Sequence, residues 1–246
     1  MRRLLVLVLL GTLGATPLVA APSLMGDPGL ILAPTADYAI HGHYALGINA
    51  VDEAYRPYYR EPHATLMHYY NVVAVPRVDV TLALVNFDNR LGVQWFGPER
   101  PIAPTPTGEA AGGWNVDRVL SGRWLVWPNR GWVPGLAVGW RDVGGTENYA
   151  AKYAVLSRRF PGHARPNCVG WGMHLGVGTG TLNGVFGGVD FWPNRRVGLL
   201  AERVKGKTSV GAHLKLTNQL ILQPSLVDLR TLSGGVVYTN AMGFGP

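Results

Sequence analysis

The stretch VPGLAVGWRDVGGT, residues 133–146, decides the fold class. In an extended chain successive side chains point to opposite faces, which places Leu136, Val138 and Trp140 on one face. Small residues occupy the other face, which ends in Arg141. This combination is typical of a membrane β-barrel, because the bulky apolar face meets lipid and the small, polar face lines a narrow lumen. We therefore expect the apolar residues to face lipid and Arg141 to face inward.

The same alternation recurs along the chain in segments of about ten residues that are bounded by turn signals. Residues 78–84, 169–178 and 209–217 are the clearest examples. An exported soluble β-sandwich is the alternative, but its strands seldom need so much glycine, which weakens them. The prediction is an all-β, transmembrane, antiparallel up-and-down barrel of about 12 strands, near residues 39–51, 63–74, 77–87, 114–127, 132–143, 147–159, 168–178, 184–192, 196–205, 207–217, 219–224 and 233–242.

The N-terminal sequence MRRLLVLVLLGTLGATPLVAAP has the layout of a secretory signal peptide. We expect cleavage near Ala20 or Ala21, so that residues 1–21 form the signal peptide and residues 22–246 the barrel domain. The single Cys168 excludes an internal disulfide, and charged residues make up only 15% of the chain. The expected location is the outer membrane of a double-membraned bacterium.

The tetrapeptide WPNR occurs twice, at residues 127–130 and 192–195. The offset corresponds to about four strands with their turns, which returns the chain to the same rim. Trp127 and Trp192 are therefore expected in one interfacial aromatic girdle. The long connections at residues 52–62 and 96–113 then fall on the opposite, outer side.

A few ionisable residues are expected to form a polar network in the lumen: Arg141, Lys152, His174, Asp190, Glu202, His213 and Lys215. Glu202 and Lys215 could pair across neighbouring strands. Two interpretations stay open: the network plugs a narrow barrel with its own side chains, or it forms a constriction that binds or passes an anionic glycan.

Catalysis and metal binding find little support in the sequence. No local pattern joins a histidine to the serines of the expected strands, which are Ser157, Ser209 and Ser233. His41 and His43 have a spacing that can bind a metal, but no third ligand is visible. The prediction is a protein that is not an enzyme and has no metal or cofactor.

Three stretches resemble the YjbH-like outer-membrane proteins, which are associated with exopolysaccharide production. They are GLILAPTADYAIHGHYALGINAVD (residues 29–52), PGLAVGWRDVGGTENYAAKYAVLSRRF (134–160) and NGVFGGVDFWPNRRVGLLAERV (183–204). The resemblance implies a single-unit version of this barrel family and supplies no catalytic residues.

The expected function is therefore non-enzymatic assistance in the export or surface assembly of an exopolysaccharide. The alternative is a structural barrel with a self-plugged lumen that anchors an envelope partner through its outer loops. Expected partners are outer-membrane lipid, an anionic polysaccharide and other envelope or polysaccharide-export proteins, and no nucleic acid.

Overall fold

The computed structural model of the chain describes residues 21–51, 65–86, 116–130, 132–143, 149–161 and 170–242. The expected signal peptide, apart from Ala21, lies outside the described residues, as do Cys168 and the connections 52–62 and 96–113. Within the described part of the chain, no helix has the length and hydropathy needed to cross a membrane.

The described residues form 13 strands in one antiparallel sheet. Their bounds are β1 His43–Val51, β2 Thr65–Val75, β3 Val78–Asn86, β4 Val116–Trp127, β5 Gly135–Arg141, β6 Ala151–Pro161, β7 Gly170–Gly178, β8 Gly184–Trp192, β9 Val197–Val204, β10 Lys207–Lys215, β11 Leu220–Leu222, β12 Ser225–Val227 and β13 Thr231–Ala241. The 3-10 turn η2 Gly180–Leu182 precedes β8.

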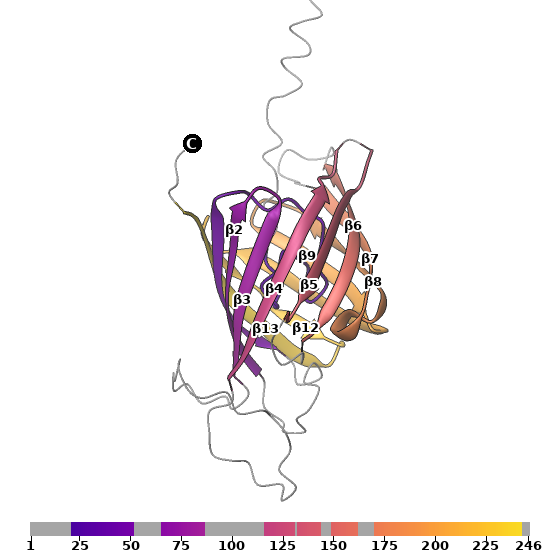
Figure 1. Cartoon of the computed structure of the whole chain (residues 1–246). Helices are drawn as coiled ribbons and strands as arrows, with labels where there is room; N and C mark the ends of the chain where they lie inside the picture. The colour runs from indigo at the N-terminus through magenta and orange to yellow at the C-terminus, as the bar shows by residue number, and fades with distance from the viewer. Residues whose placement is uncertain are drawn as a thin grey trace, which may run out of the picture.

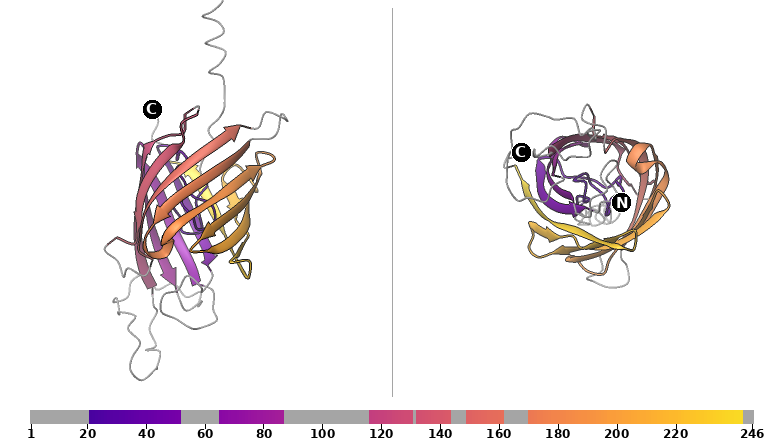
Figure 2. Two further views of the ribbon diagram at one scale, coloured as in Figure 1. Left: turned by 90° about the vertical axis from the view of Figure 1, so that its right-hand side faces the viewer. Right: turned by 90° about the horizontal axis from the view of Figure 1, so that it is seen from below.

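The sheet closes on itself because β1 pairs with β13. Strands β11 and β12 together take one position between β10 and β13, and Gln223 and Pro224 separate them. Proline has no N–H to donate to a strand ladder, which accounts for a break at this point. The result is an antiparallel barrel with 12 strand positions. Figures 1 and 2 show the closed barrel from the side and from its end. The predicted fold is confirmed, although the strand expected at 219–224 continues, after this break, to Val227.

Strand direction divides the turns between two rims. His43, at the start of β1, and Ala241, at the end of β13, lie side by side at one rim, which we call the terminal rim. An even number of strands separates the two WPNR stretches, so both lie at this rim, as their spacing predicts. The two-residue turn Lys205–Gly206 closes a hairpin at the opposite rim, and both residues have the positive φ that such a turn requires.

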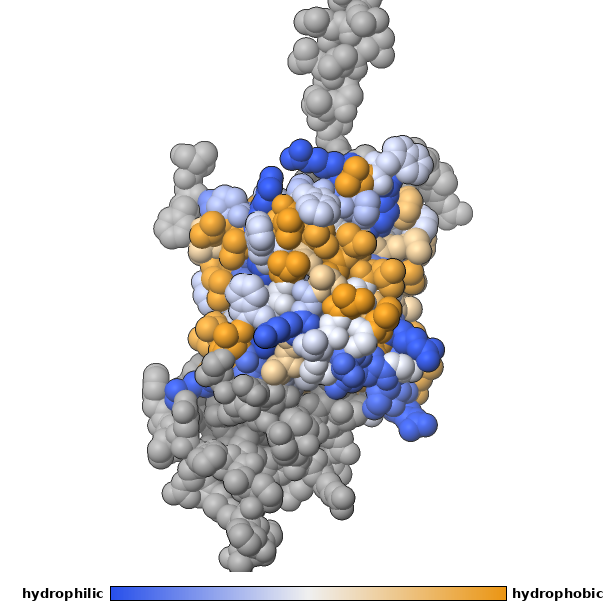
Figure 3. All heavy atoms as spheres, turned by 45° about the vertical axis from the view of Figure 1, so that its right-hand side comes forward, coloured by the Kyte–Doolittle hydropathy of each residue, from blue (hydrophilic) through white to orange (hydrophobic). Residues whose placement is uncertain are grey.

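The side chains of each strand alternate between a buried and an exposed face. In β7, Gly170, Gly172, His174 and Gly176 are buried, whereas Trp171, Met173, Leu175 and Val177 point outward. In β5, Ala137, Gly139 and Arg141 are buried and Trp140 is exposed, as the alternation in residues 133–146 predicts. Figure 3 shows the consequence on one side of the barrel, where apolar residues gather at mid-height and hydrophilic residues lie towards both rims.

Several inward glycines give room to an aromatic side chain on the neighbouring strand. Gly139 lies directly opposite Tyr153, and a Cβ at Gly139 would lie 2.5 Å from the tyrosine hydroxyl. Gly176 stands in the same relationship to Phe186. The sequence analysis expected small and polar residues on the inward face, and these aromatic rings occupy the space that the glycines leave there.

Candidate functional site

The lumen is occupied by residues 21–42, which we call the plug segment. This segment folds back on itself through backbone hydrogen bonds, including Leu24 N to Ile31 O at 2.8 Å and Thr35 N to Pro28 O at 3.0 Å. Every residue from Ala21 to Asp37 is buried. In the end-on view of Figure 2 the plug segment is the indigo trace enclosed by the ring of strands.

The plug segment and the barrel wall are joined by an ion pair between Asp27 and Arg141. Arg141 Nη2 donates to both carboxylate oxygens of Asp27 at 2.8 Å, and Nε donates to one of them at 3.1 Å. Nη2 also donates to the carbonyl of Leu32 at 2.8 Å. Both ionic side chains are almost completely buried. A buried ion pair is favourable only when further hydrogen bonds satisfy it, and the Leu32 carbonyl contributes one.

Glu202 of β9 holds the same part of the plug segment by accepting hydrogen bonds from three consecutive backbone N–H groups. Its carboxylate oxygens accept from Ile31 at 3.1 Å, from Leu32 at 2.9 and 3.1 Å, and from Ala33 at 2.9 Å. A cradle of successive N–H groups is a binding site for an anion. The Leu32 residue thus binds Arg141 through its carbonyl and Glu202 through its N–H.

Two further arginines bind the distal part of the plug segment. Arg123 of β4 donates to the carbonyls of Thr35 and Asp37 and forms a buried ion pair with Asp79 of β3 at 2.8 Å. Arg159 of β6 binds both oxygens of the Asp37 carboxylate. Burial is the largest influence on the pKa of Asp37 and would raise it, but the charge of Arg159, a smaller coulombic contribution from His174 and the hydrogen bonds from Arg159 and Thr35 together lower this pKa below its ordinary value.

A buried chain of hydrogen bonds connects Ser157, His174 and Asp190 across β6, β7 and β8. Ser157 Oγ lies 2.8 Å from His174 Nδ1, and His174 Nε2 lies 2.8 Å from an oxygen of Asp190. Because the carboxylate can only accept, Nε2 carries a proton; when the ring is neutral, Nδ1 accepts from the serine hydroxyl. The sequence analysis found no pattern joining these residues, and that conclusion is wrong, because Ser157 and His174 are directly opposite in the β6–β7 register.

The connectivity of this chain is that of a nucleophile, a base and an orienting acid. Here, however, the hydroxyl of Ser157 accepts a hydrogen bond from the backbone N–H of Ala36 at 2.7 Å, and its side chain is buried beneath the plug segment. Asp190 is further bound by Arg159 and by the indole N–H of Trp192. In this arrangement the hydrogen bonds of Ser157, His174 and Asp190 fix the plug segment to the wall.

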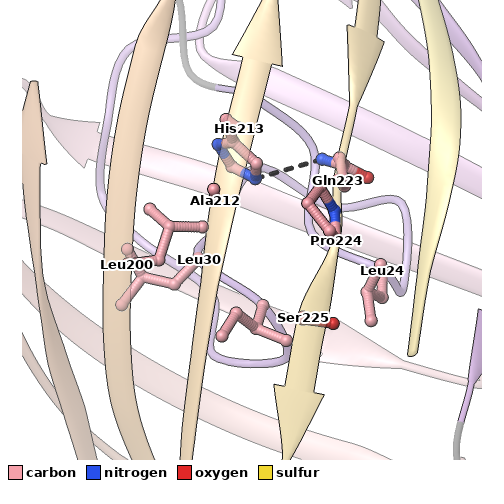
Figure 4. A pocket seen from close by; sticks show the side chains of 9 residues that line it. Leu24, Leu30, Leu200, Ala212, His213, Gln223, Pro224 and Ser225 are labelled. Carbon is pink, nitrogen blue, oxygen red and sulfur yellow. Dashed lines mark hydrogen bonds between the residues drawn. The ribbon is translucent and has the colours of Figure 1, made fainter. Parts of the chain in front are cut away.

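A small cavity lies between the plug segment and β9, β10 and the β11–β12 break (Figure 4). Its volume is about 10 Å³, enough for about one water molecule. The side chain of Gln223 reaches from the break to His213 at 3.1 Å and to the carbonyl of Pro22. The lumen is therefore filled at this level, and the cavity is a packing gap.

Five residues of the expected lumen network are buried inside the barrel: Arg141, His174, Asp190, Glu202 and His213. The prediction that Lys152 faces the lumen is wrong. Tyr153 and Val155 face inward on β6, and the alternation of the strand therefore places Lys152 outside. Lys215 is half-buried and lies over the ring of Trp192, with Nζ 5.3 Å from the ring centre. The suggested pair of Glu202 with Lys215 is wrong, because the plug segment takes the carboxylate.

Of the two tryptophans expected in the aromatic girdle, only Trp127 is exposed. Trp127 is exposed near the terminal rim and donates to the carbonyl of Pro134. Trp192 is only 2% exposed, because Asp190 accepts its indole N–H inside the barrel and the inward Gly198 leaves room for its ring. The prediction that Trp192 faces lipid is therefore wrong.

The sequence analysis missed the residues that bind the plug segment to the wall, above all Asp27, Asp37, Arg123 and Arg159. Alternation within β4 would have placed Arg123 inward, two residues from Ser121. Asp27 and Asp37 lie in a stretch without strand periodicity, so no local signal assigns them to the lumen.

The histidine pair of the sequence analysis does not form a metal site with its neighbours. His41 is exposed and Nε2 lies 3.1 Å from the carbonyl of Ala74. Among the described residues, no three His, Cys, Asp or Glu side chains are grouped as metal ligands would be.

Comparison with known proteins adds the family. Solved structures similar to this chain include two engineered variants of the porin of Rhodopseudomonas blastica. One is 12% identical with a TM-score of 0.32, the other 11% identical with a TM-score of 0.31, and each match covers 72% of this chain and 55% of the porin. The chain thus spans about half the length of these porins. No curated protein matches the chain. The family of the exopolysaccharide biosynthesis protein YbjH matches residues 22–196, and this chain therefore belongs to the YjbH family.

Proposed function

We propose that this chain is a barrel of the bacterial outer membrane that assists the export or surface assembly of an exopolysaccharide without catalysing a reaction. The observation that carries the proposal is the inverted distribution of its side chains. Leu175, Trp140 and their neighbours point outward, and ionic groups such as Arg141 and Glu202 point inward. Such a distribution supports hydrocarbon rather than water around the barrel, because contact between water and a large apolar surface is unfavourable.

Membership of the YjbH family supports the link to exopolysaccharide. Polar groups that point into the lumen support a role with a hydrated polymer, because sugars are recognised by hydrogen bonds and by charged groups when the polymer is acidic. The Ser157, His174 and Asp190 chain supports no catalytic step in this proposal, because the plug segment covers the serine.

Removal of the encoding gene from its bacterium tests the proposal. We expect the amount of surface exopolysaccharide to fall, and we expect the protein in the outer-membrane fraction, with heat-modifiable migration on a gel. Complementation with the Ser157→Ala variant should restore polymer production, because the hydroxyl has no chemical role. Normal polymer in the deletion strain, or a protein that stays in the soluble fraction, contradicts the proposal.

The filled lumen favours a second candidate function, a structural barrel that anchors an envelope partner. Planar bilayers separate the two functions. A conductance that appears when the plug segment is loosened, and that a charged glycan blocks, favours transport. A barrel that stays silent in both states favours the anchor.

A further inference from the structure

The plug segment gives two opposite kinds of hydrogen-bonding partner to two wall residues, Arg141 of β5 and Glu202 of β9, whose strands are separated by three others but whose side chains meet at Leu32. It gives Arg141 a carboxylate, that of Asp27, held by two nitrogens. It gives Glu202 three N–H donors, from Ile31, Leu32 and Ala33. We call the pair of wall residues the Arg141–Glu202 site.

Among the described residues, the side-chain hydrogen bonds of Arg141 and Glu202 go to the plug segment. Arg123 differs, because it keeps the wall residue Asp79 as an ion-pair partner whatever the plug segment does. Withdrawal of the plug segment would break the ion pair of Arg141 and the three hydrogen bonds of Glu202 and leave only water to replace them. The plug segment therefore leaves the site most easily when another molecule supplies a carboxylate and several donors at the same place.

We propose that the Arg141–Glu202 site binds an acidic sugar unit, with its carboxylate on Arg141 and its hydroxyls donating to Glu202, and that the plug segment occupies the site as an internal mimic. This inference rests on the proposed function and names its substrate class. A planar guanidinium binds a carboxylate through two parallel hydrogen bonds, and sugar hydroxyls are donors suited to a carboxylate acceptor. A uronic acid carries both groups on one ring.

A second carboxylate position lies further along the lumen wall and favours a polymer over a single small anion. Arg159 binds Asp37 through two nitrogens, in the way that Arg141 binds Asp27. The wall residue Asp190 also binds Arg159, so part of the positive charge of Arg159 is already neutralised when the plug segment is absent. Two arginine positions suit a chain that carries repeated carboxylates.

Calorimetric titration of the full chain in detergent tests the proposal, with an oligogalacturonate as the probe and a neutral maltooligosaccharide of equal length as the control. The wild-type protein should bind the oligogalacturonate weakly, because the plug segment competes for Arg141 and Glu202. It should show no binding of the neutral sugar. Hydrogen exchange of the peptide that contains residues 31–33 should accelerate when the oligogalacturonate binds, because Glu202 exchanges its partners.

Two substitutions should move the affinity in opposite directions. Asp27→Asn weakens the mimic and leaves Arg141 intact, so the affinity for oligogalacturonate should rise about tenfold or more, as the fraction of open sites rises. Arg141→Gln removes the carboxylate partner, so binding should fall about tenfold or more, the effect of losing a charge-assisted pair. Asp228→Asn is the matched control, because Asp228 pairs with Lys207 at the opposite rim and does not contact the plug segment.

Three results would overturn the proposal: no binding by either the wild type or Asp27→Asn, equal binding of the neutral sugar, or equal weakening by Asp27→Asn and Arg141→Gln. If Asp27→Asn does not form a heat-modifiable barrel, Asp37→Asn repeats the test at Arg159 with the same two outcomes. Loss of exopolysaccharide in the deletion strain is measured separately, so a failed titration rejects the acidic ligand and leaves the proposed function standing.

Discussion

Asp27 and Arg141 lie 114 positions apart in the sequence, yet their side chains form a two-nitrogen ion pair inside the barrel. The pair links the segment before β1 to the end of β5. It makes the interior of this barrel a packed protein core, in which the apolar Leu24, Leu30 and Leu32 are as buried as the ionic groups.

Glu202→Ala should release the plug segment without opening the barrel. The substitution removes the acceptor of three N–H groups, and each hydrogen bond to a charged group contributes about 1.5–3 kcal/mol. Hydrogen exchange of residues 31–33 should accelerate strongly, while exchange in β7 stays slow. Glu202→Gln keeps one acceptor oxygen, so its exchange rate at residues 31–33 should lie between those of the wild type and Glu202→Ala. Unchanged exchange in Glu202→Ala would show that Glu202 does not hold the segment.

Leu175→Arg should impair membrane insertion. Leu175 is 61% exposed in the middle of β7, and an arginine facing lipid near the bilayer midplane costs about 2–4 kcal/mol. The measurement is the yield of heat-modifiable barrel after refolding into lipid vesicles. Leu175→Ile is the matched control and should refold like the wild type. Equal yields for both variants would mean that this face does not contact hydrocarbon.

Gly176→Val should destabilise the barrel through its neighbour Phe186. A Cβ at Gly176 would overlap the Phe186 ring and would lie 2.8 Å from the carbonyl of Ala154, and overpacking of this kind costs about 1–3 kcal/mol. The urea midpoint of unfolding in detergent should fall. Phe186→Leu in the same chain should restore part of the loss, whereas Val177→Leu on the lipid face should change little. Failure of the second substitution to restore any stability would place the strain in the backbone.

The docking of the plug segment should survive moderate acid because of Asp37. The pKa of Asp37 is lowered by Arg159 in the folded protein, so its stabilising contribution is complete above the ordinary aspartate pKa, about 3.9, and is lost as the pH falls through the lowered value. Exchange of the peptide that contains Asp37, corrected for the intrinsic effect of pH, should show constant protection from pH 7 to pH 5. Asp37→Asn should lower the protection across this whole range. Loss of protection already at pH 5 in the wild type would contradict the assignment.

The strands were predictable from the sequence because lipid selects side chains two residues apart. That local rule places Trp140 outside and Arg141 inside. It fails for Lys152, which stands near the start of β6 at the rim, where a long side chain can reach water from the lipid face. Trp192 follows the rule, because it stands two residues after the inward Asp190 on the same strand; the girdle prediction is wrong because it rested on the repeated WPNR instead.

The plug segment was not predictable for a different physical reason. Its buried polar groups are satisfied by residues more than 80 positions away, such as Arg123, Arg141 and Glu202. No periodicity records such contacts. The short separation of 17 residues between Ser157 and His174 was accessible in principle, because the pairing of the consecutive strands β6 and β7 sets their register.

The glycine and aromatic pairs have a consequence for the history of the sequence. Gly47 with Tyr69, Gly139 with Tyr153 and Gly176 with Phe186 are each directly opposite on neighbouring strands, and in each the ring occupies the volume of the missing side chain. Neither member can change size alone, so an ancestor that enlarged one had to shrink the other. Homologues should therefore show these positions covarying in couples, with bulk exchanged between adjacent strands and the total conserved.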